Sequence, residues 1–230
     1  MAKISRICQI AGKVESTSGI AIALAATEAT ILAYEPVMDM EFEQFKRNPV
    51  VKHMSRFASE PGSRKMSLTF KAELMGPLSA AKGVTLAITP FLRACGFSET
   101  LSVGVSNVYV PVSSSFVTVT LAQYIDGLRK TMAGCAGNVK FQFKVGEPVM
   151  CEFTFQGKYN EHSDQSMLSP TYPAQVPLIF MGATVTILGA SLVIDNLEID
   201  MQNEIYLSPL PSDVGGIDFA KITGRNPQMT

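Results

Sequence analysis

Three kinds of residue are scarce in this sequence: there is no tryptophan, there are two histidines, and the four cysteines lie far apart. No two cysteines form a Cys-x-x-Cys pair, whereas structural zinc sites need ligands clustered in that manner. We therefore expect no metal site, and we expect the thiols to pack as small apolar side chains. These thiols belong to Cys8, Cys95, Cys135 and Cys151.

Catalytic signatures are also missing. The chain contains neither a Gly-x-Ser-x-Gly nor a His-Glu-x-x-His motif. His53 and His162 fall in segments predicted to be loops, where a histidine is more often solvated than catalytic. The run GKVESTSG at residues 12–19 lacks the second Gly-Lys-Ser/Thr cluster of a phosphate-binding loop, so we interpret it as part of a mobile N-terminal segment. We predict no enzymatic activity, no catalytic residue and no cofactor.

Charges of both signs are few and balanced. Nineteen basic and twenty acidic side chains leave a net charge of −1 without any block of like charge, so tight binding to nucleic acid is not expected. Only 17% of the residues are charged and 47% are hydrophobic, which indicates surface buried in an assembly. Apolar runs such as residues 20–27 are too short to cross a bilayer, and no signal peptide opens the chain. We expect a protein made in a cytoplasm, without membrane contact.

The clearest positive signal is the alternation of apolar and polar residues. Residues 138–159 alternate on both sides of a Gly-Glu-Pro turn, which predicts a long antiparallel hairpin with one apolar face. A three-residue connection would pair Val145 with Val149 and place Phe141 opposite Phe153. Because such a hairpin is not stable alone in water, other sheets should cover its apolar face.

Further alternation predicts a chain of strands. The predicted strands are residues 64–74, 107–112, 116–125, 128–132, 184–188 and 191–201. Asp126-Gly127 predicts a tight turn between two of them. Helix signals occur once, at residues 85–96, where Thr89 can cap, Pro90 fits the first turn and Gly96 can end the helix.

This pattern predicts a mainly β protein, a β-sandwich or flattened barrel with one short flanking helix. We expect one domain over residues 1–230, with an extended N-terminal segment, a long loop at about residues 43–64 and a C-terminal tail. A loop of that length inside a domain usually has a function.

Four stretches follow one another in a characteristic order. They are GKVESTSG at residues 12–19, TPFLRACGFSET at 89–100, the predicted strands of 124–159, and NLEIDMQNEIYLSPL at 196–210. Together they resemble the tail tube (major tail) proteins of long-tailed bacteriophages. The resemblance implies a β-sandwich with a flanking helix, six subunits in each ring, and rings stacked into a hollow tube through which the genome passes.

The resemblance also implies a location and partners. The protein would be a structural component of the virion tail, made in the cytoplasm of the bacterial host. It would contact copies of itself and the tape-measure, tail-terminator and distal tail proteins, and genomic DNA would pass without specific binding. The alternative from another class is a carbohydrate- or ligand-binding β-sandwich module, which would need clustered surface aromatics; Tyr159 and Tyr172 are the candidates.

Within a ring, we expect residues 64–74 and the 138–159 hairpin to build an inner barrel by pairing with strands of neighbouring subunits. We further expect the 43–64 loop to contact an adjacent ring, because it mixes basic and apolar side chains; the alternative is a loop folded back over its own domain. The residues concerned are Phe45, Lys46, Arg47, Lys52, Met54, Arg56 and Phe57.

The last expectation concerns the lumen of such a tube. DNA must slide through it, so its wall should be neutral to acidic. On the predicted late strand, Glu198, Asp200 and Glu204 share one face with Asn196 and Gln202, the most acidic polar face in the chain. A solvated outer face would show the same pattern, so both interpretations stay open.

Overall fold

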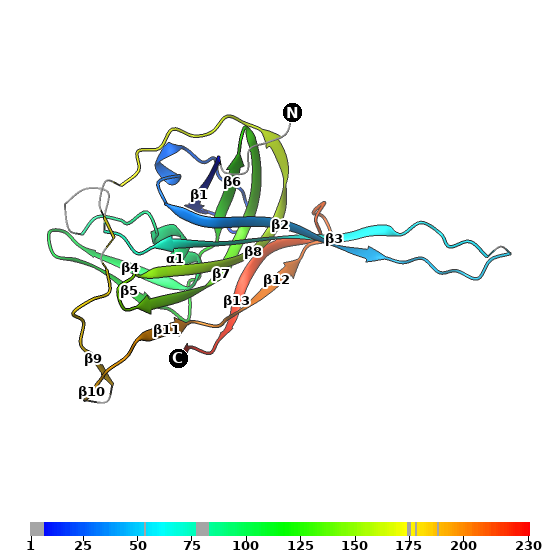
Figure 1. Ribbon diagram of the computed structural model, residues 1–230. Helices are drawn as coiled ribbons and strands as arrows, with labels where there is room; N and C mark the ends of the chain where they lie inside the picture. The colour runs from blue at the N-terminus through cyan, green and yellow to red at the C-terminus, as the bar shows by residue number, and fades with distance from the viewer. Residues whose placement is uncertain (1–6, 53, 77–82, 174–175, 178, 188) are drawn as a thin grey trace.

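Antiparallel strands account for most of the molecule (Figure 1). The computed structural model describes residues 7–52, 54–76, 83–173, 176–177, 179–187 and 189–230. Within these residues there is a single α-helix, α1 (Thr89–Ala94), and one short 3-10 turn, η1 (Ala26–Glu28). The predicted mainly β class with one short helix is therefore confirmed.

The strands form one large sheet and three hairpin-like pairs. Their bounds are β1 (Cys8–Val14), β2 (Ala33–Phe45), β3 (Glu60–Glu73), β4 (Phe97–Ser102), β5 (Ser106–Pro111), β6 (Val119–Ile125), β7 (Leu128–Lys144), β8 (Met150–Asp164), β9 (Val185–Ile187), β10 (Ala190–Leu192), β11 (Asn196–Asp200), β12 (Asn203–Pro209), β13 (Ile217–Arg225) and β14 (Gln228–Met229). The large sheet has the order β1-β6-β7-β8-β3-β2, and β11 joins β7 with β14 beside it. The pairs are β4–β5, β9–β10 and β12–β13. No closed barrel forms in the described part of the chain.

Strand β7 connects the two halves of the large sheet. It begins after the predicted tight turn, in which Asp126 and Gly127 have φ of 42° and 82°, the left-handed values such a turn requires. Its first half pairs with β6 and its second half with β11. The prediction of a separate strand at residues 128–132 is wrong, because a bulge at Gly134 (φ 57°) bends the chain without ending the ladder.

The β7–β8 hairpin is confirmed, but its register differs by two residues from the predicted one. Phe141 lies opposite Cys151, not opposite Phe153. The β7–β8 pairing ends at Gln142 opposite Met150, so the connection is longer than the predicted three residues, and the Val145 N–H donates to the carbonyl oxygen of Asp195 at 3.1 Å. A shift of two keeps the same side chains on the buried face.

The core lies between the large sheet and α1. Phe70 of β3 stacks on Phe153 of β8 with ring centroids 5.2 Å apart, and Phe91 of α1 meets the Phe70 ring edge-on at the same distance. Gly12 of β1 permits this packing, because a Cβ there would come within 2.8 Å of the Phe91 ring. The helix thus fills the open side of the curved sheet.

Helix α1 is shorter than predicted. It begins at Thr89, whose Oγ1 accepts the Leu86 N–H at 3.2 Å and bonds the Tyr109 hydroxyl, so Thr89 ties the helix to β5 and does not act as its cap. Gly96, with φ of 81°, ends the helix as predicted. The Arg225 guanidinium donates to the Gly96 carbonyl oxygen at 3.0 Å and so satisfies this end of the helix.

Two segments expected to be irregular are strands. Residues 12–14 belong to β1, which pairs with β6, so the interpretation of 12–19 as part of a mobile segment is wrong for them. The expected C-terminal tail contains β13, whose Ala220 and Ile222 pack on Ala136 of β7. The β12–β13 pair therefore forms a second layer, as a sandwich requires.

Candidate assembly surfaces

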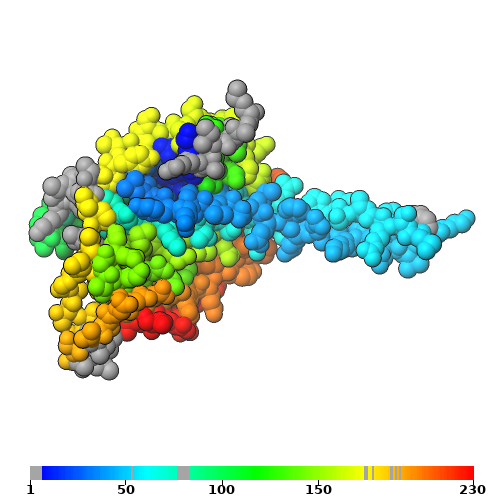
Figure 2. Space-filling model, viewed as in Figure 1, coloured from blue at the N-terminus to red at the C-terminus, as the bar shows by residue number. Residues whose placement is uncertain are grey.

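The β2–β3 hairpin continues beyond the body as a long projection, which we call the arm (residues 42–64; Figures 1 and 2). The sequence predicted a loop here, and the structure corrects its bounds. Strand pairing continues to Phe45 opposite Glu60, so among the described residues of the arm only 46–52 and 54–59 lack regular structure. Figure 2 shows the arm pointing away from the body, so it does not cover its own domain.

Apolar side chains on the arm are exposed to water. Val50 and Met54 are fully exposed, and Phe45 is 69% exposed. Large apolar side chains gathered on a projection of a folded protein mark a contact surface. All seven residues predicted for the ring-stacking loop lie on this arm.

The distal part of the arm carries positive charge. Residues 46–59 contain four basic and no acidic side chains: Lys46, Arg47, Lys52 and Arg56. The Arg47 guanidinium lies over the Phe57 ring, 5.6 Å from its centroid, and 3.6 Å from a carboxylate oxygen of Glu60. These contacts orient Arg47 but leave the other three cations to face solvent or a partner. His53 lies outside the described residues.

The polar face of the large sheet brings the acidic strand β11 together with β3, β7 and β8. Lys71, Glu152, Lys140 and Asp200 lie side by side across β3, β8, β7 and β11, so charges of opposite sign alternate along the row. The adjacent row places Glu198 opposite Gln142. The two lysine-bearing strands and the acidic strand therefore share one face.

Ion pairing partly neutralises this face. Lys140 Nζ lies 2.6 Å from a carboxylate oxygen of Glu198, and this hydrogen bond raises the pKa of Lys140. Asp200 accepts from the Asn138 side chain at 2.7 Å and from the Gln202 N–H at 2.9 Å. Such a face stays close to neutral at physiological pH.

The structure separates Glu204 from the other two acidic candidates. β11 ends at Asp200, and Gln202 adopts a φ of 44° before β12 begins in a different sheet. The Asp200 side chain fixes this break by its bond to the Gln202 N–H. The predicted continuous acidic face through Glu204 is therefore wrong. The alternation of polar and apolar residues in the sequence continues past Asp200, but the strand ends there.

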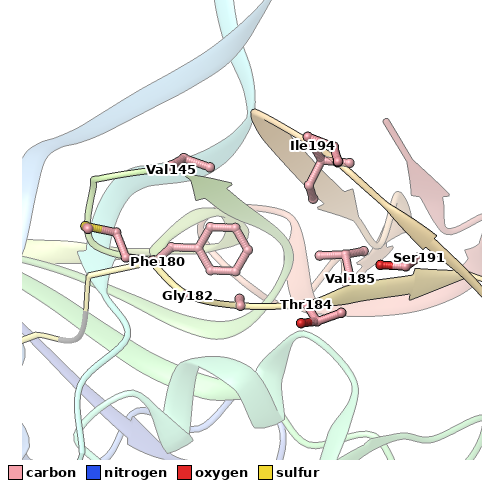
Figure 3. Close-up of a pocket in the computed structure, with 10 residues that line it drawn as sticks. Val145, Phe180, Gly182, Thr184, Val185, Ser191 and Ile194 are labelled. Carbon is pink, nitrogen blue, oxygen red and sulfur yellow. The ribbon is translucent and has the colours of Figure 1, made fainter.

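A pocket of about 340 Å³ with mostly apolar lining residues lies at the β9–β10 pair (Figure 3). In Figure 1 this pair lies away from the arm. Phe180 forms the floor of the pocket and packs on Phe143, with ring centroids 5.6 Å apart. Its lining residues are Val145, Phe180, Met181, Gly182, Ala183, Thr184, Val185, Ser191, Val193 and Ile194. None of these has an acidic or basic side chain, so the pocket offers apolar surface and two hydroxyls.

Burial controls the chemistry of the cysteines. It raises the pKa of Cys151 to about 12 and the pKa of Cys95 and Cys135 well above the usual value. Cys8 is half-buried, and burial raises its pKa as well. In the described part of the chain, no group of three or more His, Cys, Asp or Glu residues could hold a metal ion.

The aromatic residues considered for ligand binding do not form a platform. Tyr159 packs against the core and lies under the Arg64 guanidinium, 5.8 Å from the ring centroid. Tyr172 is partly exposed and accepts a hydrogen bond from Gln9. In the residues that the structure describes, no helix is long and apolar enough to span a membrane.

These features define a class: a β-rich protein whose prominent surfaces are a projecting arm and open sheet edges. The model of the family described as phage tail tube protein matches residues 7–229, so the chain belongs to the phage tail tube protein family. Comparison with curated proteins gave no match. Members of this family are structural proteins of the virion tail that assemble into a tube, which agrees with the resemblance noted in the sequence.

Proposed function

We propose that the chain forms closed rings of six subunits, and that the rings stack into the hollow tube that conducts DNA into the host. Closure into a ring is supported by the unpaired outer edges of the large sheet. The strand order ends at β2 on one side and at β1 on the other, and the branch from β7 through β11 ends at β14; among the described strands, none of these three outer edges has a further partner. Unpaired edges are templates for pairing with another chain, and a ring leaves none free.

Electron microscopy of the concentrated purified protein tests this proposal. Rings with sixfold symmetry and short tubes are the expected particles, with β3, β7 and β8 in the inner wall. Sedimentation across a range of salt concentrations provides the second measurement. A protein that stays monomeric under all these conditions and never forms rings would contradict the proposal.

The arm is the part of the chain that we assign to ring stacking. Its exposed apolar side chains and its four cations suit a protein contact, and the arm extends beyond the surface of its own body. Replacing residues 47–58 by Asn-Gly should preserve the folded body, because a two-residue turn fits the hairpin. We expect this variant to form rings that do not elongate.

A matched control separates the chemistry of the arm from its length. A variant in which residues 47–58 are exchanged for a Gly-Ser segment of equal length should behave like the shortened arm. Long tubes from the shortened variant would show that the arm is not a contact between rings.

We also propose that the polar face with Glu198 and Asp200 lines the lumen. Its alternating charges offer DNA no continuous basic track, so phosphates would slide past it. The exposed Thr154 on this face permits a test that leaves every ion pair intact. Thr154→Lys should assemble normally but slow DNA release, whereas the control Thr154→Glu should not.

Equal DNA release by both Thr154 variants and the parent would remove this face from the DNA path. Glu204 does not belong to the face.

At the two ends of the tube we expect contacts with tail-terminator and distal tail proteins, and inside it with a tape-measure protein. Co-purification of each with assembled tubes would check these partners.

A further inference from the structure

A groove of about 420 Å³ lies at the base of the arm, where β2 and β3 leave the body. Its lining residues are Glu41, Phe42, Glu43, Ser63, Lys65, Leu207, Pro209, Gly216 and Ile217. Its apolar lining residues are Phe42 of β2 together with Leu207, Pro209 and Ile217 of the β12–β13 pair. Its volume falls within the range of about 300–1,000 Å³ typical of binding sites.

Two of the lining residues, Glu41 and Glu43, are acidic, and Asp39 continues this acidic stripe along β2 beyond the groove. Asp39, Glu41 and Glu43 alternate along β2 and so lie on one face of an edge strand, and all three are exposed. Lys65 Nζ lies 2.9 Å from a carboxylate oxygen of Glu41 and neutralises part of this charge. Together the stripe and Lys65 leave this part of the surface negative.

The distal arm has the complementary chemistry. Lys52 and Arg56 flank Met54, which is fully exposed, and Val50 is equally exposed. No acidic residue occurs between residues 46 and 59. An apolar side chain between two cations matches a groove that is lined by both apolar side chains and carboxylates.

We propose that the groove is the receptor for the arm tip (residues 50–52 and 54–56) of another copy of this chain. This inference rests on the proposed stacking of rings through the arm, and it names the surface that the arm binds. The tip cannot reach the groove of its own chain, because the arm leads about ten residues outward from the groove to the tip, roughly 33 Å at the rise of an extended chain.

This contact joins two different surfaces of the subunit. A heterologous contact of this kind does not close on itself and repeats along one direction, so it produces an open stack. If the arm lies along the tube axis, the separation between tip and groove sets the axial repeat at roughly 33 Å. The arm would then act as the spacer between successive rings.

A disulfide cross-link tests the contact directly. Met54→Cys places a thiol on the tip, and Ser63→Cys places one in the groove. Two cysteines can be bridged only when their Cα atoms are within about 7 Å, so the pair cannot close within one chain. Oxidised tubes of the double variant should give a ladder of covalent oligomers on a denaturing gel, and each single variant should give none.

A charge exchange provides the independent measurement. Glu43→Lys should raise the protein concentration needed for elongation about tenfold while rings still form. Adding Lys52→Glu to that variant should restore elongation. Glu161→Lys, the same change at an exposed position on β8, is the control and should have no effect.

The outcomes distinguish this inference from the proposed function. In one outcome the shortened arm prevents elongation, tubes of the variant with Met54→Cys and Ser63→Cys give no cross-link, and Glu43→Lys elongates normally. Stacking through the arm then holds, and the groove is not the receptor of the arm. If the shortened arm still elongates, the stacking proposal itself fails. A cross-link with rescue by charge exchange supports both.

Discussion

The carboxylate of Glu15 accepts a 2.8 Å hydrogen bond from the backbone N–H of Gly134, which joins the chain after β1 to the bulge in β7. Glu15 is buried and accepts three more hydrogen bonds, from Gly19 N–H at 2.9 Å and from the hydroxyls of Thr118 and Thr120 at 2.6 and 2.7 Å. Four donors thus converge on one carboxylate, so this residue fixes the bulge and the N-terminal segment together.

Glu15→Gln should lower the free energy of unfolding by about 2–4 kcal/mol, because the amide turns an acceptor into a donor that faces other donors. Chemical denaturation of the parent and the variant measures this difference. Glu161→Gln, at an exposed position, is the control and should change stability little. A Glu15→Gln variant as stable as the parent would show that the hydrogen bonds at Glu15 do not support the fold.

Gly12→Ala should also destabilise the fold, by about 1–3 kcal/mol, because its Cβ would lie 2.8 Å from the Phe91 ring and 3.0 Å from Leu121 Cδ2. Thermal unfolding measures the loss. The double variant with Phe91→Leu tests the cause: the smaller side chain should make the added methyl group less costly. Additive effects of the two changes would contradict a direct clash.

Thiol labelling should distinguish Cys8 from the other cysteines. The thiolate is the reactive form, and burial raises the pKa of Cys151 to about 12 and the pKa of Cys95 and Cys135 well above normal. In the native protein at pH 8, we expect at most one thiol to react, and slowly. All four should react after denaturation, and rapid native labelling of two or more would contradict the buried positions.

The ion pair between Lys158 and Asp213 predicts a pH dependence of stability. Burial alone would raise the pKa of Asp213, but hydrogen bonds from Lys158 and the Gly215 N–H outweigh it, so the pKa is lowered. A carboxylate with a lowered pKa stabilises the fold above its unfolded pKa of about 4, and this contribution disappears as the pH falls through the folded value.

Asp213→Asn should therefore cost roughly 1–2 kcal/mol at pH 7, and the difference from the parent should shrink below about pH 4. Denaturation of both proteins at several pH values measures it. An unchanged difference down to pH 3 would mean that the ionised carboxylate is not the stabilising form.

The sequence predicted those elements in which side-chain alternation follows the strand directly. Residues 64–74 alternate without interruption, and in the structure Met66, Leu68 and Phe70 are buried on one face. β13 was missed because its buried residues, at 217, 220 and 222, do not alternate, and the β12–β13 pairing contains register shifts. Local patterning does not reveal a strand that bulges to fit a partner.

The candidate surfaces also combine features that the sequence predicted with features that depend on strand pairing. The composition of residues 43–64 indicated a contact segment, but pairing that continues to Phe45 and Glu60 makes it a projecting arm, and this depends on register. The alternation of Lys140 with Glu152 and Asp200 needs β11 beside β7, a pairing across more than fifty residues. Sequence spacing could not show that these charges share one face.

The late pairing of strand β7 with β11 affects how the chain folds during synthesis. The second half of β7 pairs with β11, which follows only after β8 and a long connecting segment. During synthesis that half therefore has an unpaired edge until residues 196–200 leave the ribosome, and non-local pairing of this kind is slow to form. The β7–β8 hairpin is thus complete early but exposed on one side, and aggregation at that edge competes with folding until β11 covers it.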